Sequence, residues 1–259
     1  MSVPSRFLRG AGAHAEIDGD AFNDGAFILS IGGAQQSHVD LADPRNVFYE
    51  YLRRIANVID VFRPKGEPIR ILHLGAGALT LARYVQVTRP GSRQVAIERE
   101  RELLAFVVEH LPLPEGTDCA LLVEDASDTL VACAEGSYDA VVLDVFSGAD
   151  GATELAAPET YRLLARAAGK EGVVLVNVGD DPPLAFARRQ ARMLQNTGYD
   201  VAALAEAGMF SGKHAGNIVL AATAQWDAEW TAALVAAGPH PAAVLTGSSY
   251  DDFARAGAD

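Results

Sequence analysis

The feature that most constrains the fold is a regular alternation of apolar segments and helical segments between residues 69 and 222. The apolar segments are nearly unbroken, as expected for strands buried on both faces of a parallel sheet. Strand–helix repeats of this kind form a sheet with helices on both faces. We therefore expect an α/β fold with a doubly wound, mostly parallel, Rossmann-like sheet. The expected strands are 69–74, 94–97, 119–123, 138–143 and 172–178, with a closing pair at 199–204 and 217–222, and the expected helices are 101–110, 127–133, 158–168 and 182–197, with a further helix that ends at 87.

A separate β unit is expected near the N-terminus, where residues 13–40 contain short β-prone segments. Residues 27–31 are apolar, Gly32 and Gly33 favour a tight turn, and residues 34–40 lead back. This pattern predicts a β-hairpin. A unit of this size is not stable alone, so it should pack on the rest of the chain or on a second subunit.

The next segment marks the boundary between the two expected units. Apolar residues at helical spacing predict a helix over 46–62. We therefore divide the chain into a small N-terminal β unit over 1–45 and a Rossmann-like catalytic domain over 46–259.

The net charge of the chain limits the classes of partner that it is expected to bind. The 259 residues include 21 Lys+Arg and 34 Asp+Glu, which gives a formal net charge of −13. A chain with this negative charge is not expected to bind nucleic acid or an anionic membrane surface, but the charge is compatible with cationic small substrates. Cys119 and Cys133 do not have the spacing of a zinc site or a disulfide framework, and no apolar stretch is long enough to cross a bilayer. We expect a cytoplasmic protein.

A glycine-rich turn after the first strand is the first candidate for a ligand site. Gly75 and Gly77 match the start of a GxGxxG pattern, but Thr80 stands at the third glycine. Glycines here let the backbone approach a ligand at a helix N-terminus, although a tight turn alone also explains them. Glu98 follows about 20 positions later, at the end of the next expected strand, where a carboxylate can accept hydrogen bonds from ribose hydroxyls.

Two further acids end expected strands. Asp125, followed by Ala126, comes after the third strand, and Asp144 comes directly after the fourth. Strand ends of a doubly wound sheet converge on one crevice, so these acids should lie near Glu98. Asp125 can also be the N-cap of the following helix. Asp144 is the better functional candidate, because a carboxylate at the end of a buried strand is costly unless it is paired or wet.

Other polar motifs have simpler explanations. The pair His38 and Asp40 on the hairpin could hold a metal, but a lone HxD is more often structural. His73 lies inside an expected strand and should be a core histidine. Trp226 and Trp230 are expected to be packing residues. We predict no metal site.

Several of these segments together resemble the polyamine aminopropyltransferase family, typified by spermidine synthase, whose fold is that of methyltransferases that use S-adenosylmethionine. The resemblance runs from about residue 27 to 222. The similar segments are 34–37 (AQQS, similar to VQST), 48–51 (FYEY, similar to YHEM), 74–79 (LGAGAL, similar to GGGDGG), 97–100 (IERE, similar to VEID), 124–126 (EDA, similar to GDA), 138–144 (YDAVVLD, similar to the start of YDVIIxDSSDP) and 216–220 (GNIVL, similar to the last strand).

The resemblance implies a role for each matched residue. Asp144 takes the place of the catalytic aspartate. The nucleoside of decarboxylated S-adenosylmethionine, or of S-adenosylmethionine itself, is expected to contact Gly75, Gly77, Glu98, Asp125 and Ala126. Gln36 and Tyr49 are expected to face a diamine substrate such as putrescine. The resemblance also implies a homodimer, and its chemistry needs no metal.

This sequence departs from the family at residues that would bind the aminopropyl group and the polyamine. Ala78 stands where the GGGDGG motif has its aspartate, Ser147 where DSSD has its second aspartate, and Phe48 where YHEM has its tyrosine. The expected activity is transfer of an aminopropyl group to a diamine, weakened by these replacements. A methyltransferase that uses S-adenosylmethionine and a non-catalytic nucleoside-binding relative are the alternatives.

Overall fold

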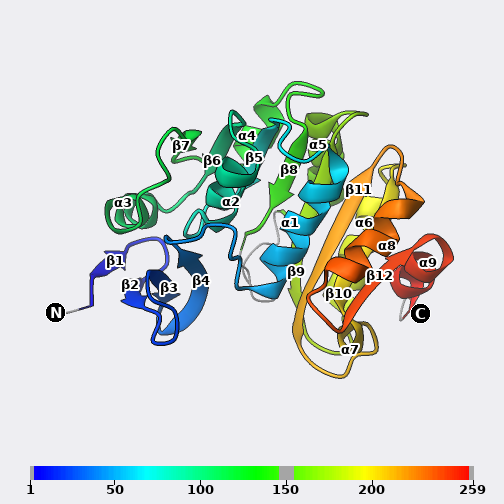
Figure 1. The fold of residues 1–259 in the computed structure, drawn as a ribbon. Coiled ribbons are helices and arrows are strands. Elements are labelled where there is room, and N and C mark those ends of the chain that lie inside the picture. The colour runs from blue at the N-terminus through cyan, green and yellow to red at the C-terminus, as the bar shows by residue number, and fades with distance from the viewer. Residues whose placement is uncertain (1–2, 146–154, 257–259) are drawn as a thin grey trace.

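A computed structural model of the chain describes residues 3–145 and 155–256 (Figure 1). Within these residues, eight strands form one sheet in the order β12-β10-β11-β9-β8-β5-β6-β7, and four form a second sheet in the order β1-β2-β3-β4. The main sheet comprises β5 (Arg70–Leu74), β6 (Arg93–Ile97), β7 (Asp118–Leu122), β8 (Ala140–Leu143), β9 (Val173–Asp180), β10 (Asp200–Glu206), β11 (Gly216–Thr223) and β12 (Ala242–Thr246).

The main sheet is parallel from β7 to β9 and antiparallel beyond it. Strand β5 runs parallel to both of its neighbours, β6 and β8. The β6–β7 and β8–β9 pairs are parallel as well. Strand β11 runs antiparallel to β9, and β10 runs antiparallel to both β11 and β12. The expected mostly parallel α/β sheet is therefore confirmed.

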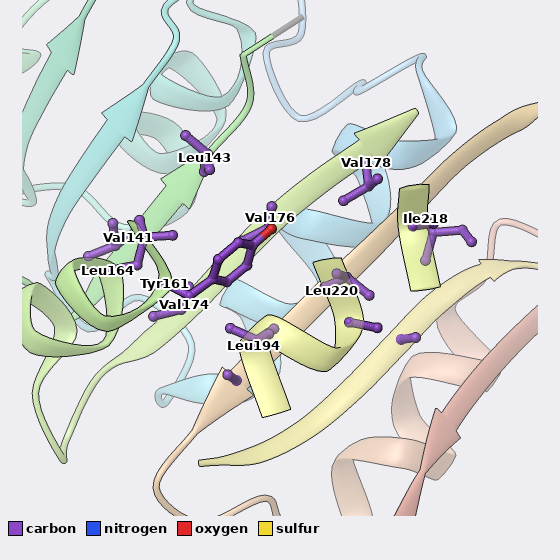
Figure 2. Close-up of a cluster of buried hydrophobic side chains, with 14 of the residues drawn as sticks. Val141, Leu143, Tyr161, Leu164, Val174, Val176, Val178, Leu194, Ile218 and Leu220 are labelled. Atoms are coloured by element: carbon purple, nitrogen blue, oxygen red, sulfur yellow. The ribbon is translucent and has the colours of Figure 1, made fainter. Parts of the chain in front are cut away.

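Helices cover both faces of this sheet, as the unbroken apolar strands require. On β9, Val174 and Val176 pack in one core, while Val173 and Leu175 pack in the core on the other face. The first core lies under α4 (Ala126–Ala132), α5 (Pro158–Ala168), α6 (Ala185–Gln195) and α9 (Gly247–Arg255) (Figure 2). The second lies under α1 (Glu50–Phe62), α2 (Thr80–Thr88) and α8 (Ala228–Ala237).

The N-terminal unit is larger than the expected hairpin. It is an antiparallel meander of β1 (Ser5–Leu8), β2 (Ala13–Gly19), β3 (Ala26–Ile31) and β4 (Ala34–Asp40). Its buried residues share a core with α2 and with α3 (Arg101–His110). The unit thus packs on the rest of the chain, and the division at residue 45 stays a prediction.

Several boundaries differ from the sequence expectation. Helix α1 begins at Glu50 rather than at residue 46, because residues 43–46 form a turn with a hydrogen bond from Asn46 N–H to the carbonyl of Asp43. Asp40, just before this turn, accepts hydrogen bonds from the backbone N–H of Ala42 and Asp43. Helix α6 begins at Ala185, after a leucine with a φ of +66°. The expected closing strands are followed by α8, β12 and α9, and the short helix α7 (Ala207–Phe210) lies between β10 and β11.

Candidate active site

The expected site residues lie along one edge of the main sheet. Strands β8, β5, β6 and β7 are consecutive parallel neighbours, so their carboxyl ends face the same way. Asp144 follows β8, Gly75 follows β5, Glu98 follows β6, and Asp125 follows β7 three residues after its end. The structure therefore brings the four residues to one edge, in the order Asp144, Gly75, Glu98, Asp125.

The glycine turn packs directly on the strand end that carries Asp144. Gly75 has a φ of +95° and Gly77 a φ of +48°, values that favour glycine. A side chain at Gly75 would collide with the backbone carbonyl of Asp144. The turn is held by hydrogen bonds from Gly75 N–H to the carbonyl of Ile97 (3.0 Å) and from Asp144 N–H to that of Leu74 (2.8 Å). A ligand on this turn is therefore adjacent to Asp144.

The carboxylate of Glu98 is held in a defined position at the end of β6. Its Oε1 accepts a hydrogen bond from Glu100 N–H at 3.0 Å, and its Oε2 accepts one from Ala76 N–H at 3.4 Å. Glu98 is half-buried, so part of it remains accessible. Each carboxylate oxygen has a second lone pair, so the two oxygens can also accept hydrogen bonds from two neighbouring hydroxyl groups.

Asp125 is the N-cap of α4. Its Oδ1 accepts a hydrogen bond from Ser127 N–H at 2.8 Å. The residue is exposed, while Ala126 behind it is buried. Asp125 is therefore the helix N-cap that the sequence indicated. It is also exposed, and its contact with the nucleoside of a bound ligand stays a prediction.

Asp144 is surrounded by hydrogen-bond donors from two other elements. Asn177 of β9 donates from Nδ2 to Oδ1 of Asp144 at 2.9 Å, and the Tyr51 hydroxyl of α1 also donates to this carboxylate. Burial raises the pKa of Asp144 to about 6, and the two hydrogen bonds oppose that rise. The residue keeps a partly exposed surface. A carboxylate with a pKa near neutrality is suited to accept a proton.

Sequence reasoning missed both partners of Asp144. Tyr51 is part of the apolar stripe that predicts helix α1, and burial together with the nearby Asp144 raises the pKa of its hydroxyl, which therefore stays a donor. Asn177 interrupts an otherwise apolar strand, and that single polar residue was the available signal. Its Oδ1 is buried and has no partner among the described residues, so an acceptor atom is free beside the carboxylate.

Of the two expected substrate-binding residues, Gln36 precedes Ser37, whose Oγ accepts a hydrogen bond from the glycine turn, and Tyr49 lies beside Tyr51. Gln36 is the extra residue of a β-bulge in β4. Its neighbours Gln35 and Ser37 pair with Ser30 and Leu29 of β3, and Gln36 itself has no partner in that strand pair. It is half-buried. Tyr49 is the N-cap residue of α1, and its ring lies parallel to that of Tyr51 with the centroids 6.3 Å apart. Their roles toward a substrate remain predictions.

The replaced acids change the surroundings of the glycine turn. Ala78 is buried, and its N–H donates to Ser37 Oγ at 3.3 Å, so β4 closes over this part of the turn. No carboxylate stands at this position. Ser147, the other replacement, lies outside the residues that the structure describes.

The remaining polar motifs are structural. His38 Nε2 hydrogen-bonds to Asp20 Oδ2 at 2.9 Å, and the described part of the chain contains no group of three potential metal ligands. His73 is buried and bonds to Gln94 Oε1 at 3.0 Å, as expected for a core histidine. Trp226 and Trp230 pack edge to face. None of the helices between residues 3–145 and 155–256 is long and apolar enough to cross a membrane.

Comparisons with known proteins agree with the resemblance seen in the sequence. A polyamine aminopropyltransferase of Chromobacterium violaceum is 28% identical to this chain over 142 residues, which are 55% of this chain and 53% of that protein. The chain thus spans about half the length of the curated relative that it matches. No family model matches the chain.

Solved structures extend the similarity over the whole chain. A probable spermidine synthase from Corynebacterium glutamicum superposes with a TM-score of 0.89 at 25% identity, over 99% of this chain and 95% of that chain. A spermidine synthase in complex with the transition state analogue AdoDATO gives a TM-score of 0.66 at 13% identity, over 88% and 74% of the two chains. The resemblance to this family is confirmed, and the fold with it.

Proposed function

We propose that the protein is an aminopropyltransferase of the spermidine synthase type, which transfers the aminopropyl group of decarboxylated S-adenosylmethionine to an amine. The observation that carries the proposal is Asp144, a half-buried residue whose carboxyl has a pKa raised to about 6 by burial and whose backbone lies against the glycine turn. The names of the relatives support the same reaction. A diamine such as putrescine is the acceptor that the resemblance indicates.

The nucleoside half of the site fits the co-substrate. Gly75 and Gly77 let the backbone approach the ligand, and Glu98 offers two fixed carboxylate oxygens to the ribose hydroxyls. Asp125 and Ala126 lie at the far end of the same edge, where the adenine would bind. These residues orient the sulfonium group toward the strand end that carries Asp144.

The chemistry assigned to Asp144 is proton acceptance during a direct displacement. The nitrogen lone pair of the acceptor attacks the methylene carbon beside the sulfonium, the carbon–sulfur bond breaks, and methylthioadenosine leaves with the electron pair. An alkylamine with a pKa of about 10.4 is protonated at neutral pH, so it must lose a proton before it attacks. Asp144 accepts this proton.

The test of the proposal is the Asp144→Asn variant. The substitution keeps the size and removes the charge and the basicity, so release of methylthioadenosine in the presence of decarboxylated S-adenosylmethionine and putrescine should fall by about 10²-fold or more. Binding of methylthioadenosine, which lacks the sulfonium charge, should change much less. Full activity in this variant would remove Asp144 from the mechanism.

Ala78 favours a second candidate function, a methyltransferase that uses intact S-adenosylmethionine. The family aspartate at this position would repel the carboxylate of S-adenosylmethionine, and an alanine does not. The products distinguish the two reactions, because methyl transfer leaves S-adenosylhomocysteine and aminopropyl transfer leaves methylthioadenosine. Binding of either ligand without turnover would support a non-catalytic relative.

We also propose that the protein is a cytoplasmic homodimer whose two subunits contact each other through their N-terminal sheets. The exposed side chains of Phe7 on β1 and Phe22 in the β2–β3 turn support this placement. Sedimentation velocity of the wild-type protein and of the double variant Phe7→Ser, Phe22→Ser tests the dimer. A monomeric wild-type protein would contradict it.

A further inference from the structure

A polar side chain stands in the middle of the sheet, where packing alone would favour an apolar one. Asn177 of β9 is the single polar residue in the run 173–178, and the other five residues of that run are buried valines and a leucine. Strand β9 is paired on both sides, with β8 and with β11, so the backbone of Asn177 is fixed. A polar amide at such a position is costly unless hydrogen bonds compensate for it.

The strand register places Asn177 next to Asp144. Leu143 of β8 lies opposite Val176 of β9, and both side chains pack in the core shown in Figure 2. Side chains alternate between the faces of a sheet, so Asp144 and Asn177, one residue further along, project from the other face. Helix α1 covers that face, and Asn177 Nδ2 donates to Asp144 Oδ1 at 2.9 Å there.

The chemistry of the pair fixes the orientation of the amide. An ionised carboxylate can only accept hydrogen bonds, so the NH₂ group of Asn177 must face Asp144. The reverse orientation would set two acceptor oxygens against each other and leave a buried NH₂ group unpaired. In the observed orientation Asn177 Oδ1 is buried and unpartnered among the described residues. Within that part of the chain, the Asn177 side chain therefore bonds to Asp144 alone.

The neighbours of Asp144 on its other sides leave room for an amine to bond. On the β5 side, the parallel β5–β8 pair leads to Gly75, which has no side chain. From α1, the Tyr51 hydroxyl donates to the carboxylate, and no charged group among the described residues shifts the pKa of Asp144. A carboxylate has about four lone-pair sites, so two remain after Asn177 and Tyr51 have each taken one.

We propose that Asn177 is a positioning residue for Asp144, which holds the carboxylate from the β9 side in one orientation and leaves its free lone pairs for the acceptor amine. The inference rests on the proposed function and adds a residue to its mechanism. Asn177 acts from a strand whose backbone is fixed on both sides, so the carboxylate is held by a rigid element before the amine binds.

Two apolar variants remove the amide donor. Asn177→Leu has nearly the same size, and Asn177→Val is shorter and matches the valines of the same strand. Asn217→Leu is the matched control, because Asn217 lies on the neighbouring strand β11 opposite Gly179, is exposed, and does not bond to Asp144. Thermal melting of the full chain shows that each variant is folded, and Asn177→Val decides the matter if Asn177→Leu does not fold.

The first readout separates positioning from binding. For the reaction of decarboxylated S-adenosylmethionine with putrescine, the high-pH plateau of kcat should fall by about fivefold or more in the Asn177 variants, because a loose carboxylate is less often in line with the amine. The affinity for methylthioadenosine should stay within about twofold of wild type. Asn217→Leu should leave both quantities unchanged.

The second readout needs no turnover. The ¹³C NMR signal of the Asp144 carboxyl, assigned by its absence in Asp144→Asn, gives the pH midpoint of its titration. Loss of a hydrogen bond to the charged form should move this midpoint upward by about one pH unit in Asn177→Leu. A residue that only stabilised the fold would change the melting temperature and leave the midpoint in place.

An unchanged plateau or an unchanged midpoint in the Asn177 variants would overturn the proposal. Failure of the proposed function gives a different result, because the wild-type protein would then release no methylthioadenosine while the midpoint still moves in Asn177→Leu. If the wild-type protein turns over and the variants match it in both readouts, the proposed function stands and Asn177 has no part in it.

Discussion

The backbone carbonyl of Asp144 lies where the side chain of any residue other than glycine at position 75 would project. Gly75 also has a φ of +95°, which costs a residue with a Cβ about 1–2 kcal/mol. The turn that would hold the co-substrate is therefore in direct contact with the backbone of the residue whose carboxylate would take the proton, and the relative position of these two backbone segments does not depend on side-chain rotamers.

This contact predicts a large loss of stability for Gly75→Ala. Backbone strain and the collision together should lower the free energy of unfolding by about 2–5 kcal/mol. Gly33→Ala is the matched control, because Gly33 has a φ of +80° and a Cβ added there would meet no described atom within 4 Å, so only the strain applies. Denaturant unfolding of both variants measures the difference, and equal losses would show that the contact at Asp144 is unimportant.

The Tyr51 hydroxyl should tune the proton affinity of Asp144. Its hydrogen bond lowers the pKa of a carboxyl that burial has raised to about 6, so Tyr51→Phe should raise that pKa further. The acidic limb of the pH profile of kcat/KM should then move to higher pH. Tyr84→Phe is the control, since the Tyr84 hydroxyl donates to Asp60 Oδ2 at 2.6 Å and not to Asp144. If Tyr51→Phe leaves the limb in place, Tyr51 does not act on the carboxyl.

The raised pKa of Asp144 also predicts how stability depends on pH. A folded-state pKa of about 6 against an ordinary value of 3.8 means that the folded protein holds the proton more tightly than the unfolded chain. Ionisation of Asp144 therefore costs stability as the pH rises from about 4 to above 6. Asp144→Asn removes this cost, so its stability relative to wild type should increase over that range by up to about 3 kcal/mol.

Asp139 provides a control of opposite sign for this pH dependence. Burial alone would raise its pKa, but hydrogen bonds from Arg70 outweigh burial and lower it. Its ionised form therefore stabilises the fold, and that contribution is lost as the pH falls through its lowered pKa. Asp139→Asn should lose stability relative to wild type at pH 7 and lose less at pH 3. Urea unfolding at several pH values measures both variants, and parallel curves for the two would contradict the assignment.

Glu98→Gln should weaken the binding of methylthioadenosine by about 1–3 kcal/mol, because charge-assisted hydrogen bonds to the ribose are lost. Glu109→Gln is a suitable control, since Glu109 is exposed and pairs with Arg6 of β1. Calorimetric titration of the two variants gives the comparison. An unchanged affinity in Glu98→Gln would remove Glu98 from the ribose site.

The sequence was sufficient to predict the sheet and the strand-end acids, because both depend on local patterns. Strands buried on two faces give unbroken apolar runs, and an acid that ends such a run stands out, as Asp144 does. Strand β12 gives no such signal, because all five of its residues are half-buried. Helix α8 is alanine-rich and has a single buried residue, so its amphipathic pattern is weak.

The partners of Asp144 could not be predicted in the same way. Tyr51 and Asn177 are far from it in the chain, on α1 and β9, and spacing carries no information about such contacts. Tyr51 has the position of a core residue in its helix, and it acts on the site through its hydroxyl.

The core that the N-terminal sheet shares with α2 and α3 limits how reactants can enter. Leu29 and Val39 of this sheet are buried with Phe106 of α3 and with Ala78 and Leu79 beside the glycine turn. Swinging the sheet away would expose these side chains, and each large one costs about 1.5–3 kcal/mol when it is transferred to water. A hinge motion that separates the N-terminal sheet from α2 and α3 is thus energetically costly, and we expect reactants to bind and leave while this core stays intact.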